Sequence, residues 1–286
     1  MHRLRKWGIT PWVLLTPILT FLLLFYLAPF LWIVEVSLLP NPLRFPGKTM
    51  GFMNYTRLLF DAYYLRIMLQ TFLLGFGITV FTLLLGYPCA YFIARTRSRW
   101  KPFFVFMVIT PLMVSIIIRS YGWMVLLGDA GLLNTLLLAL GVTHQPVKLI
   151  YNWIGVGIAL IHVLLPFMIL TVTSVLEGID TSVEEAARVL GASRWQTFLR
   201  VTFPLSMEGV GAGCTLVFML TIGSFVTILL VGGTETMVLP LLIYQQITVA
   251  FDNNFAAAIG TLLLLISVGI LYLQARLFRV RGKTIR

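Results

Sequence analysis

Five long, predominantly apolar segments without any Asp, Glu, Lys or Arg constrain this chain more than any other feature. They occupy residues 12–34, 67–94, 149–175, 209–234 and 255–275. About 20 consecutive apolar residues are enough to cross a bilayer as a helix. Only 11% of the 286 residues are charged, against roughly 25% in soluble domains, so a water-soluble fold could not enclose these segments. The sequence therefore predicts an all-α integral membrane protein.

A sixth, shorter apolar run occupies residues 103–118 and contains Pro111. Proline removes one hydrogen bond from a helix and is tolerated within membranes at a kink. We therefore expect a kinked sixth span, which continues past Arg119 into an interfacial segment. The apolar stretch 132–140 is too short to span the bilayer, and we expect an interfacial or re-entrant helix there. The prediction is six transmembrane helices in a single membrane domain, residues 1–286, because no repeat or linker divides the chain.

The basic residues gather beside span ends on one side of this six-span arrangement. Fifteen of the 21 Lys and Arg residues lie before the first span, in the second and fourth connections, and after the last span. Such a bias marks the cytoplasmic side, so both termini and the fourth connection are predicted to be cytoplasmic. This orientation signal accounts for the net charge of +11, and no nucleic-acid partner is expected. The first span is too long for a cleaved signal peptide and lacks a small-residue cleavage site, so we expect it to be retained.

The fourth connection contains the charged stretch EEAARVLGASRWQTFLRVTFPL. A serine and a glutamate at residues 182–185 have the spacing of a capping box, which predicts the start of a helix. Gly191 can adopt the left-handed conformation that ends helices, and a second capping box at residues 193–196 predicts a second helix. Pro204 is expected to interrupt or kink the chain where it re-enters the bilayer. The sequence thus predicts a helix–turn–helix, about residues 180–204, which we call the elbow.

The elbow resembles the EAA motif of permease subunits of binding-protein-dependent ABC importers. The match comprises Glu185-Ala-Ala187, Gly191, Val201 and Phe203-Pro204, with Val201 and Phe203 in place of the family's usual Ile and Leu. Further stretches resemble the branch that serves spermidine and putrescine importers, namely NYTRLLFDAYYLRIMLQTF, LLLGYPCAYFIARTR, IIRSYGWMVLLGDAGLLNTLLLALGV and LLPFMILTVTSVLEGID. The resemblance covers most of residues 50–275. Permeases for opines, aminophosphonates, ferric iron and thiamine look similar, so those cargoes stay open.

The resemblance implies a six-helix type I ABC importer permease in the bacterial cytoplasmic (inner) membrane. It implies that a second permease completes the pathway for a small polar solute, here expected to be a polyamine. It also implies a cytoplasmic ATPase dimer that binds ATP and Mg, and an external or periplasmic substrate-binding protein. In that family the elbow is the coupling helix, which docks into a groove of the ATPase. The residues expected to couple are Glu184, Glu185, Ala186, Ala187, Arg188, Gly191, Ser193 and Arg194.

Other chemistries find little support in the sequence. Two stretches, Gly47-Lys-Thr49 and Gly282-Lys-Thr284, mimic the end of a phosphate-binding loop, but the required earlier glycine is Pro42 in one and Leu277 in the other. We therefore expect no ATP and no other cofactor on this chain. The spans contain no carboxylate pair, no Ser/His pair at helical spacing and no cluster of metal ligands, so neither an enzyme nor a metal site is expected. An intramembrane enzyme and a non-transporting assembly subunit remain the rival interpretations.

Nine polar or aromatic residues are candidates for the substrate pathway. An ionisable side chain within a span is a functional candidate, hydroxyls on one helix face can line a passage, and aromatic rings and outer acids can attract a cation. Each also has a structural explanation, because such groups pack helices together or anchor them at the membrane interface. The candidates are Tyr121, Trp123, Asp129, His162, Thr221, Ser224, Thr227, Glu235 and Asp252.

Overall fold

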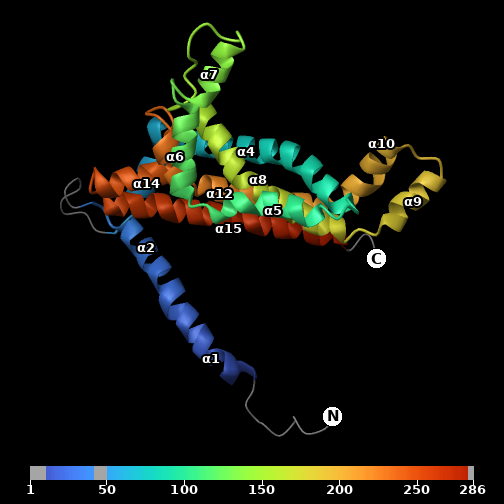
Figure 1. The fold of residues 1–286 in the computed structure, drawn as a ribbon. Coiled ribbons are helices and arrows are strands. Elements are labelled where there is room, and N and C mark those ends of the chain that lie inside the picture. The colour runs from blue at the N-terminus through green and yellow to red at the C-terminus, as the bar shows by residue number, and fades with distance from the viewer. Residues whose placement is uncertain (1–10, 42–49, 283–286) are drawn as a thin grey trace. The chain divides into compact units, whose positions relative to one another are not determined.

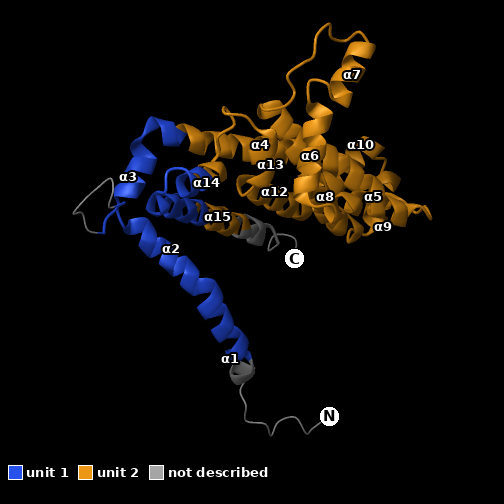
Figure 2. Ribbon diagram, turned by 60° about the vertical axis from the view of Figure 1, so that its left-hand side comes forward, with its two compact units in different colours: residues 1–65, 243–265 blue, residues 66–242, 266–286 orange. Residues whose placement is uncertain are grey.

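The computed structural model describes residues 11–41 and 50–282, which contain helices and turns and no strand. The chain forms two compact units (Figure 2), one of residues 1–65 and 243–265, the other of residues 66–242 and 266–286. The single membrane domain predicted from the sequence stays a prediction. The stretch Gly47–Thr49 and most of the basic residues at the two termini lie outside the described residues.

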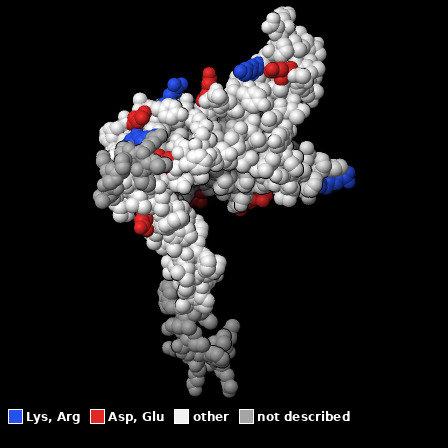
Figure 3. Space-filling model, turned by 90° about the vertical axis from the view of Figure 1, so that its left-hand side faces the viewer, with Lys and Arg blue, Asp and Glu red and all other residues white. Residues whose placement is uncertain are grey.

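Helices long and apolar enough to cross a membrane dominate the described residues. Five qualify singly, and a sixth span arises if two helices that meet at a bend of 63° are counted together. The five single candidate spans are Leu15–Leu38, Ala62–Arg95, Ile116–Ala139, Trp153–Glu177 and Asn253–Gln274, and the bent pair is Arg194–Leu205 with Met207–Ile222. Charged side chains are few on the face shown in Figure 3, where broad uncharged areas separate them. The all-α, multi-span prediction is confirmed.

The expected kinked span at residues 103–118 is wrong in its detail. Helix α5 (Lys101–Met113) passes through Pro111 and ends two residues later, and α6 (Ile116–Leu127) begins after a break. The break lies at Val114 and Ser115, whose ψ angles of 135° and 138° are extended. Helix α6 then continues well past Arg119, where an interfacial segment was expected. A short helix, α7 (Leu132–Ala139), follows where one was expected. It is counted with α6 in the candidate span Ile116–Ala139, so its interfacial or re-entrant placement stays a prediction.

The expected span at residues 209–234 is also divided. Helix α12 (Met207–Ile222) ends before Gly223, and a short α13 (Val226–Val231) follows. The last turn of α12 tightens, because the amide of Ser224 donates to the carbonyl of Thr221 at 3.0 Å. Gly223 and Ser224 are weak helix formers, so the helix ends there. The stretch stays apolar on both sides of this point, so its mean hydropathy did not reveal the break.

Helix α8 (Trp153–Glu177) forms the centre of the larger unit. It lies alongside α5 and α12 (Figure 1) and also contacts α6 and α13. Two glycines allow other helices to approach its fully buried Met168. A Cβ atom added to Gly86 of α4 (Ala62–Arg95) would lie 3.0 Å from Met168 Cγ, and one added to Gly213 of α12 would lie 2.8 Å from Met168 Sδ. Met168 therefore occupies a tight slot between three helices.

The smaller unit contains α1 (Pro11–Leu22), the π-helical η1 (Leu23–Leu27), α2 (Ala28–Leu38) and α3 (Met53–Phe60). Helix α3 is tied to the end of α2 by Asn54, whose Nδ2 donates to the carbonyl of Ser37 at 2.8 Å. The unit also contains parts of α14 (Leu239–Thr248) and α15 (Asn253–Gly282). Asp252 caps α15, because its Oδ1 accepts the amide of Phe255 at 3.2 Å.

Candidate functional site

The elbow begins with α9 (Thr181–Val189), and its cap differs from the predicted one. Asp180, rather than Ser182, is the N-cap residue, and its Oδ1 accepts the backbone amide of Ser182 at 2.9 Å. An acceptor side chain at this position satisfies an amide that the helix itself leaves unpaired. The bond favours the ionised carboxylate and holds the pKa of Asp180 below its usual value. The capping box predicted at residues 182–185 is therefore wrong, and the helix starts earlier.

The turn of the elbow follows the prediction. Gly191 has a φ of +90°, which is a left-handed conformation that residues with a Cβ atom rarely adopt. Its amide donates to the carbonyl of Arg188 at 3.0 Å. The second capping box is present as well, because Ser193 Oγ accepts the amide of Gln196 at 3.2 Å and Gln196 Oε1 accepts the amide of Ser193 at 2.9 Å.

The second half of the elbow is one helical run composed of α10 (Arg194–Thr197), η2 (Phe198–Thr202) and α11 (Phe203–Leu205). Pro204 was expected to interrupt it, but the 63° bend comes later, between Leu205 and Met207. The π-helical turn of η2 accounts for this difference. It is wider than an α-turn and lies just before the proline, so it accommodates the ring that would otherwise clash with a preceding carbonyl.

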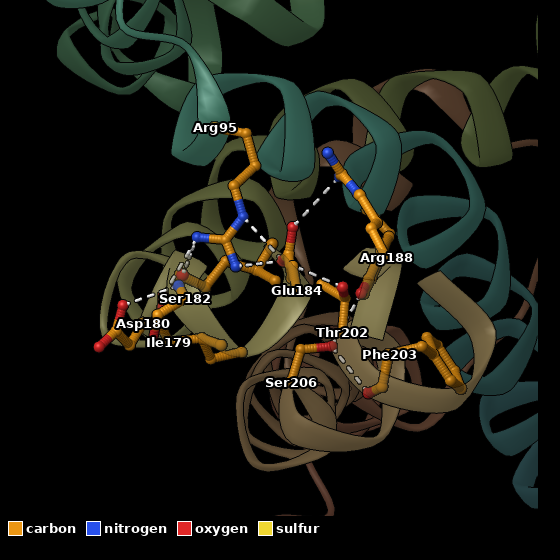
Figure 4. Close-up of polar contacts among 11 residues, drawn as sticks. Arg95, Ile179, Asp180, Ser182, Glu184, Arg188, Thr202, Phe203 and Ser206 are labelled. Carbon is orange, nitrogen blue, oxygen red and sulfur yellow. Dashed lines mark hydrogen bonds and ion pairs between the residues drawn. The ribbon is translucent and has the colours of Figure 1, made fainter. Parts of the chain in front are cut away.

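A buried ion pair joins the elbow to the end of α4 (Figure 4). Arg95, the last residue of α4, donates to Glu184 Oε1 from Nε at 3.0 Å and from Nη2 at 2.6 Å. Its Nη1 donates to the carbonyls of Leu176 at 2.9 Å and Ile179 at 3.3 Å. One guanidinium thus holds together the end of α4, the end of α8 and the first turn of α9.

Glu184 is the centre of this arrangement, with only 4% of its surface exposed. Its Oε1 also accepts the hydroxyl of Thr202 at 3.0 Å, and Arg188 Nη2 lies 3.9 Å from its Oε2. Glu184 was predicted to contact an ATPase, whereas its carboxylate is bound inside this chain. Arg95 and Thr202 were missed, since neither has a local signal that reveals its partner.

The other predicted coupling residues lie on the outside of the elbow. Glu185, Ala186, Arg188, Gly191, Ser193 and Arg194 are exposed, and Ala187 is half-buried. Val189 and Leu190 are each 88% exposed, so two bare apolar side chains stand beside the charged ones. In Figure 1, α9 and α10 extend beyond the ends of α4 and α8. The outer side of the elbow thus combines charged and apolar side chains, and its role in coupling stays a prediction.

Behind the elbow lies a cavity of about 740 Å³ against the end of α4. Aromatic rings and two arginines line it, and the lining residues are Tyr87, Pro88, Tyr91, Arg188, Arg194, Trp195, Thr197 and Phe198. The ring of Phe198 packs on Tyr87, Tyr91 and Trp195, with centroid distances of 5.7, 5.8 and 5.6 Å. This aromatic cluster packs the second half of the elbow against α4.

Some of the predicted pathway residues meet in the larger unit. Trp123 Nε1 donates to His162 Nδ1 at 3.2 Å, with the two rings edge to face. Thr227 accepts a hydrogen bond from Ser120 at 3.2 Å, a partner that no pattern in the sequence indicated. Thr221, 1% exposed, donates to a carbonyl of its own helix. Thr227 thus joins α13 to α6, whereas Thr221 bonds within its own helix. Their role as pathway lining stays a prediction.

The remaining pathway candidates differ in exposure. Tyr121, Asp129 and Glu235 are exposed, and Ser224, half-buried, donates to the carbonyl of Leu220 at 2.8 Å. Asp252, by contrast, is 2% exposed, and its Oδ2 lies 3.5 Å from Arg57 Nη1. Among the described residues, no group of three or more His, Cys, Asp or Glu side chains could hold a metal ion.

Comparisons with known proteins agree with this architecture. Residues 82–281 match the family described as Binding-protein-dependent transport system inner membrane component. The chain is 34% identical over 274 residues to spermidine/putrescine transport system permease protein PotB of Salmonella typhimurium, over 96% of this chain and 95% of that protein. The identity to the protein of the same name from Escherichia coli is 34% over 273 residues, covering 95% of this chain and 99% of that protein.

Solved structures show the same fold. A chain in the crystal structure of a bacterial alginate ABC transporter, in complex with an alginate pentasaccharide-bound periplasmic protein, superposes with a TM-score of 0.76 at 20% identity. The match covers 95% of this chain and 94% of that chain. The predicted fold of an ABC importer permease is therefore confirmed.

Proposed function

Since the chain belongs to the family of binding-protein-dependent transport system inner membrane components, we propose that it is a permease subunit of an ATP-driven importer for the polyamines spermidine and putrescine. Family membership makes the chain a transport subunit rather than an enzyme. The observation that supports the cargo is the 34% identity to polyamine permeases over nearly the whole chain. ATP and Mg²⁺ bind a separate ATPase in this proposal.

The proposed complex contains a second permease, two copies of a cytoplasmic ATPase and an external substrate-binding protein. Closure of the ATPase pair on nucleotide would push the exposed side of the elbow, where Glu185 and Arg194 lie beside bare apolar side chains. The hydrogen bonds of Arg95 to Glu184 and to the end of α8 would transmit this movement of the elbow to the membrane helices. The spans then reorient around the cargo.

The proposed orientation has both termini and the elbow in the cytoplasm. The support is the distribution of basic residues, which are concentrated beside the elbow and the chain ends. In this orientation the connections that carry Asp129 and Glu235 face the external binding protein.

Uptake by the reconstituted complex tests the proposal. The complete complex in proteoliposomes, with ATP enclosed on the ATPase side, should accumulate labelled spermidine or putrescine delivered by the binding protein. A complex with a hydrolysis-deficient ATPase is the control, and an opine and an aminophosphonate are the competitors. Polyamine accumulation that requires hydrolysis supports the proposal. Uptake of an opine or aminophosphonate instead would assign another cargo, and no ATP-dependent uptake of any solute would favour an assembly subunit.

A further inference from the structure

Among the described residues, the cavity behind the elbow is lined by two basic side chains and by no acidic one. Arg194 has no ion-pair partner in the part of the chain that the structure describes. Arg188 has a contact of 3.9 Å with Glu184, but Arg95 also binds that carboxylate and lies closer to it (Figure 4). Guanidinium groups stay charged at any physiological pH. The cavity is therefore positive, and the side chains around it offset little of that charge.

Two of the hydroxyls in the cavity lining are bonded within the chain. The hydroxyl of Tyr87 forms a hydrogen bond of 2.8 Å with the hydroxyl of Ser206. The hydroxyl of Thr197 donates to the carbonyl of Ser193 at 3.0 Å. Most of the remaining wall consists of aromatic rings, among them Phe198. A ligand that fits this cavity needs an anionic end for the guanidinium groups and an apolar end for the rings.

The position of the cavity along α4 matches the layer in which lipid headgroups meet the hydrocarbon. Helix α4 is a candidate span and ends at Arg95. Tyr91 and Tyr87 precede that end by about 6 and 12 Å of helix, whereas both arginines of the cavity belong to the elbow. Tyrosine and tryptophan rings are enriched at this level of a membrane protein, and Trp195 lines the same cavity. The arginines thus lie toward the water and the tyrosines toward the bilayer.

We propose that this cavity binds the headgroup of an anionic phospholipid, with Arg188 and Arg194 on the phosphate and the aromatic rings against the glycerol and the first part of the acyl chains. Guanidinium groups form strong, often bidentate, hydrogen bonds with phosphate oxygens. In the proposed orientation the cavity faces the cytoplasmic leaflet, where basic pockets beside membrane helices bind anionic headgroups. Its volume of about 740 Å³ lies within the range of small-molecule sites, about 300 to 1,000 Å³.

Other ligands match the cavity less well. A polyamine is cationic, so the two arginines would repel it. A free phosphate ester shares the anionic end but would leave the aromatic wall uncovered. The inference goes beyond the proposed function, because it requires α4 to cross a membrane and does not depend on the cargo. A lipid held between the elbow and α4 would make the movement of the elbow sensitive to the lipid composition of the membrane.

Photolabelling of the complete complex in lipid nanodiscs tests the site directly. Phosphatidylglycerol and phosphatidylcholine, each with a diazirine near the glycerol, are compared, and mass spectrometry locates the labelled residues. Phosphatidylglycerol should label residues 87–91 and 194–198 several times more than phosphatidylcholine does. Helix α2, whose apolar side chains are largely exposed, reports ordinary bilayer contact and should be labelled equally by both lipids. Equal labelling of the cavity by the two lipids overturns the proposal, as does a cavity that is labelled in this chain alone but not in the complete complex, because the ATPase would then occupy it.

A second measurement removes the two charges. Arg188→Gln/Arg194→Gln should lower the affinity of the complex for phosphatidylglycerol about tenfold, measured by native mass spectrometry during a titration with the lipid. Arg97→Gln/Arg99→Gln is the matched control, because it removes two exposed arginines just beyond the end of α4 that do not line the cavity. The control should bind the lipid as the wild type does. An equal loss in both variants would reflect general attraction between charges and overturns the site, as does unchanged affinity in the cavity variant.

A competition experiment separates a lipid from a soluble phosphate ester. Glycerol 3-phosphate carries the same anionic group without acyl chains, so it should not displace phosphatidylglycerol when the two are present at equal concentration. Displacement under these conditions would assign the cavity to a soluble ligand and overturns the lipid proposal. None of these readouts involves uptake, so polyamine transport by the wild-type complex upholds the proposed function whichever way the lipid experiments come out.

Discussion

Arg95 Nη2 lies 2.6 Å from Glu184 Oε1 and joins the last residue of α4 to the first turn of α9. Charge-assisted hydrogen bonds of this length are stronger than neutral ones, and this pair is largely shielded from water. The elbow is therefore attached to the membrane helices by side-chain chemistry as well as by the chain itself.

Removal of one partner from this pair should destabilise the protein. Glu184→Gln leaves the guanidinium of Arg95 unpaired in a site that is 15% exposed, and we expect a loss of about 3 kcal/mol in unfolding free energy. Thermal unfolding of the purified protein in detergent measures this loss. The double variant Arg95→Gln/Glu184→Gln should lose less than the sum of the single variants, and strictly additive losses would contradict the pair. Glu177→Gln breaks the exposed pair with Lys101 and should lose less than about 1 kcal/mol.

Changes on the exposed side of the elbow should separate ATP hydrolysis from transport. Gly191→Asp introduces a Cβ atom at a φ of +90°, which adds strain of about 1 kcal/mol and distorts the turn. Glu185→Lys reverses an exposed charge. Each variant should hydrolyse ATP but transport fewer polyamine molecules per ATP than the wild type. Gly178→Ala is the control, because Gly178 has an ordinary φ of −75°. Wild-type transport stoichiometry in both variants would rule out this role.

The start of the elbow should depend on pH through Asp180. The pKa of its carboxyl is lowered by the amide of Ser182, so the cap stabilises α9 fully above the unfolded-state pKa of 3.8. This stability is lost as the pH falls through the lower folded pKa. Hydrogen exchange of the Ser182 amide, followed from pH 6 down to about 2, should show α9 opening in the acid range. Asp180→Asn retains an acceptor without the ionisation, so the acid transition should disappear.

The two outer acids should respond differently to neutralisation. Glu235 is exposed and has no ion-pair partner in the part of the chain that the structure describes, so Glu235→Gln should raise the KM for a polyamine and leave assembly intact. Asp252 is buried, forms an ion pair with Arg57 and caps α15. Asp252→Asn should therefore lower the thermal stability of the complex. For both variants, uptake kinetics give the KM and thermal unfolding of the same preparations gives the stability. An unchanged KM in Glu235→Gln would remove this acid from the route of the cation.

The orientation can be tested by thiol labelling of intact cells. In a variant without Cys89 and Cys214, single cysteines introduced near residues 4 and 284 should resist a membrane-impermeant reagent, because the positive-inside rule assigns both to the cytoplasm. A cysteine in place of exposed Asp129 should react and serves as the positive control. Ready labelling of either terminus would reverse the proposed orientation.

The elements that the sequence predicts well are those specified by neighbouring residues. The long charge-free runs identify the spans because an uninterrupted apolar helix needs only local composition. The turn at Gly191 and the capping box at Ser193 were also found, since each depends on residues within one helical turn. These signals depend only on nearby residues, and tertiary packing did not change the local structure that they predict.

The elements missed depend on partners far away in the chain or on breaks within apolar runs. Arg95 and Glu184 are 89 residues apart, and no periodic pattern connects them. The break after Ile222 lies in a stretch that stays apolar on both sides, so hydrophobicity alone cannot reveal it. Asp180 was not predicted as the N-cap of α9, because Ser182 and Glu185 have the spacing of a capping box two residues later.

The slot around Met168 has a chemical consequence under oxidative stress. Peroxide adds an oxygen atom to a methionine sulfur and makes it polar, and exposed methionines such as Met113, 77% exposed, should be converted first. Met168 is fully buried, and Gly86 and Gly213 leave no room for another atom beside it. Its sulfur should stay reduced while the helices are packed. A sulfoxide at this position would record that α4, α8 and α12 had come apart.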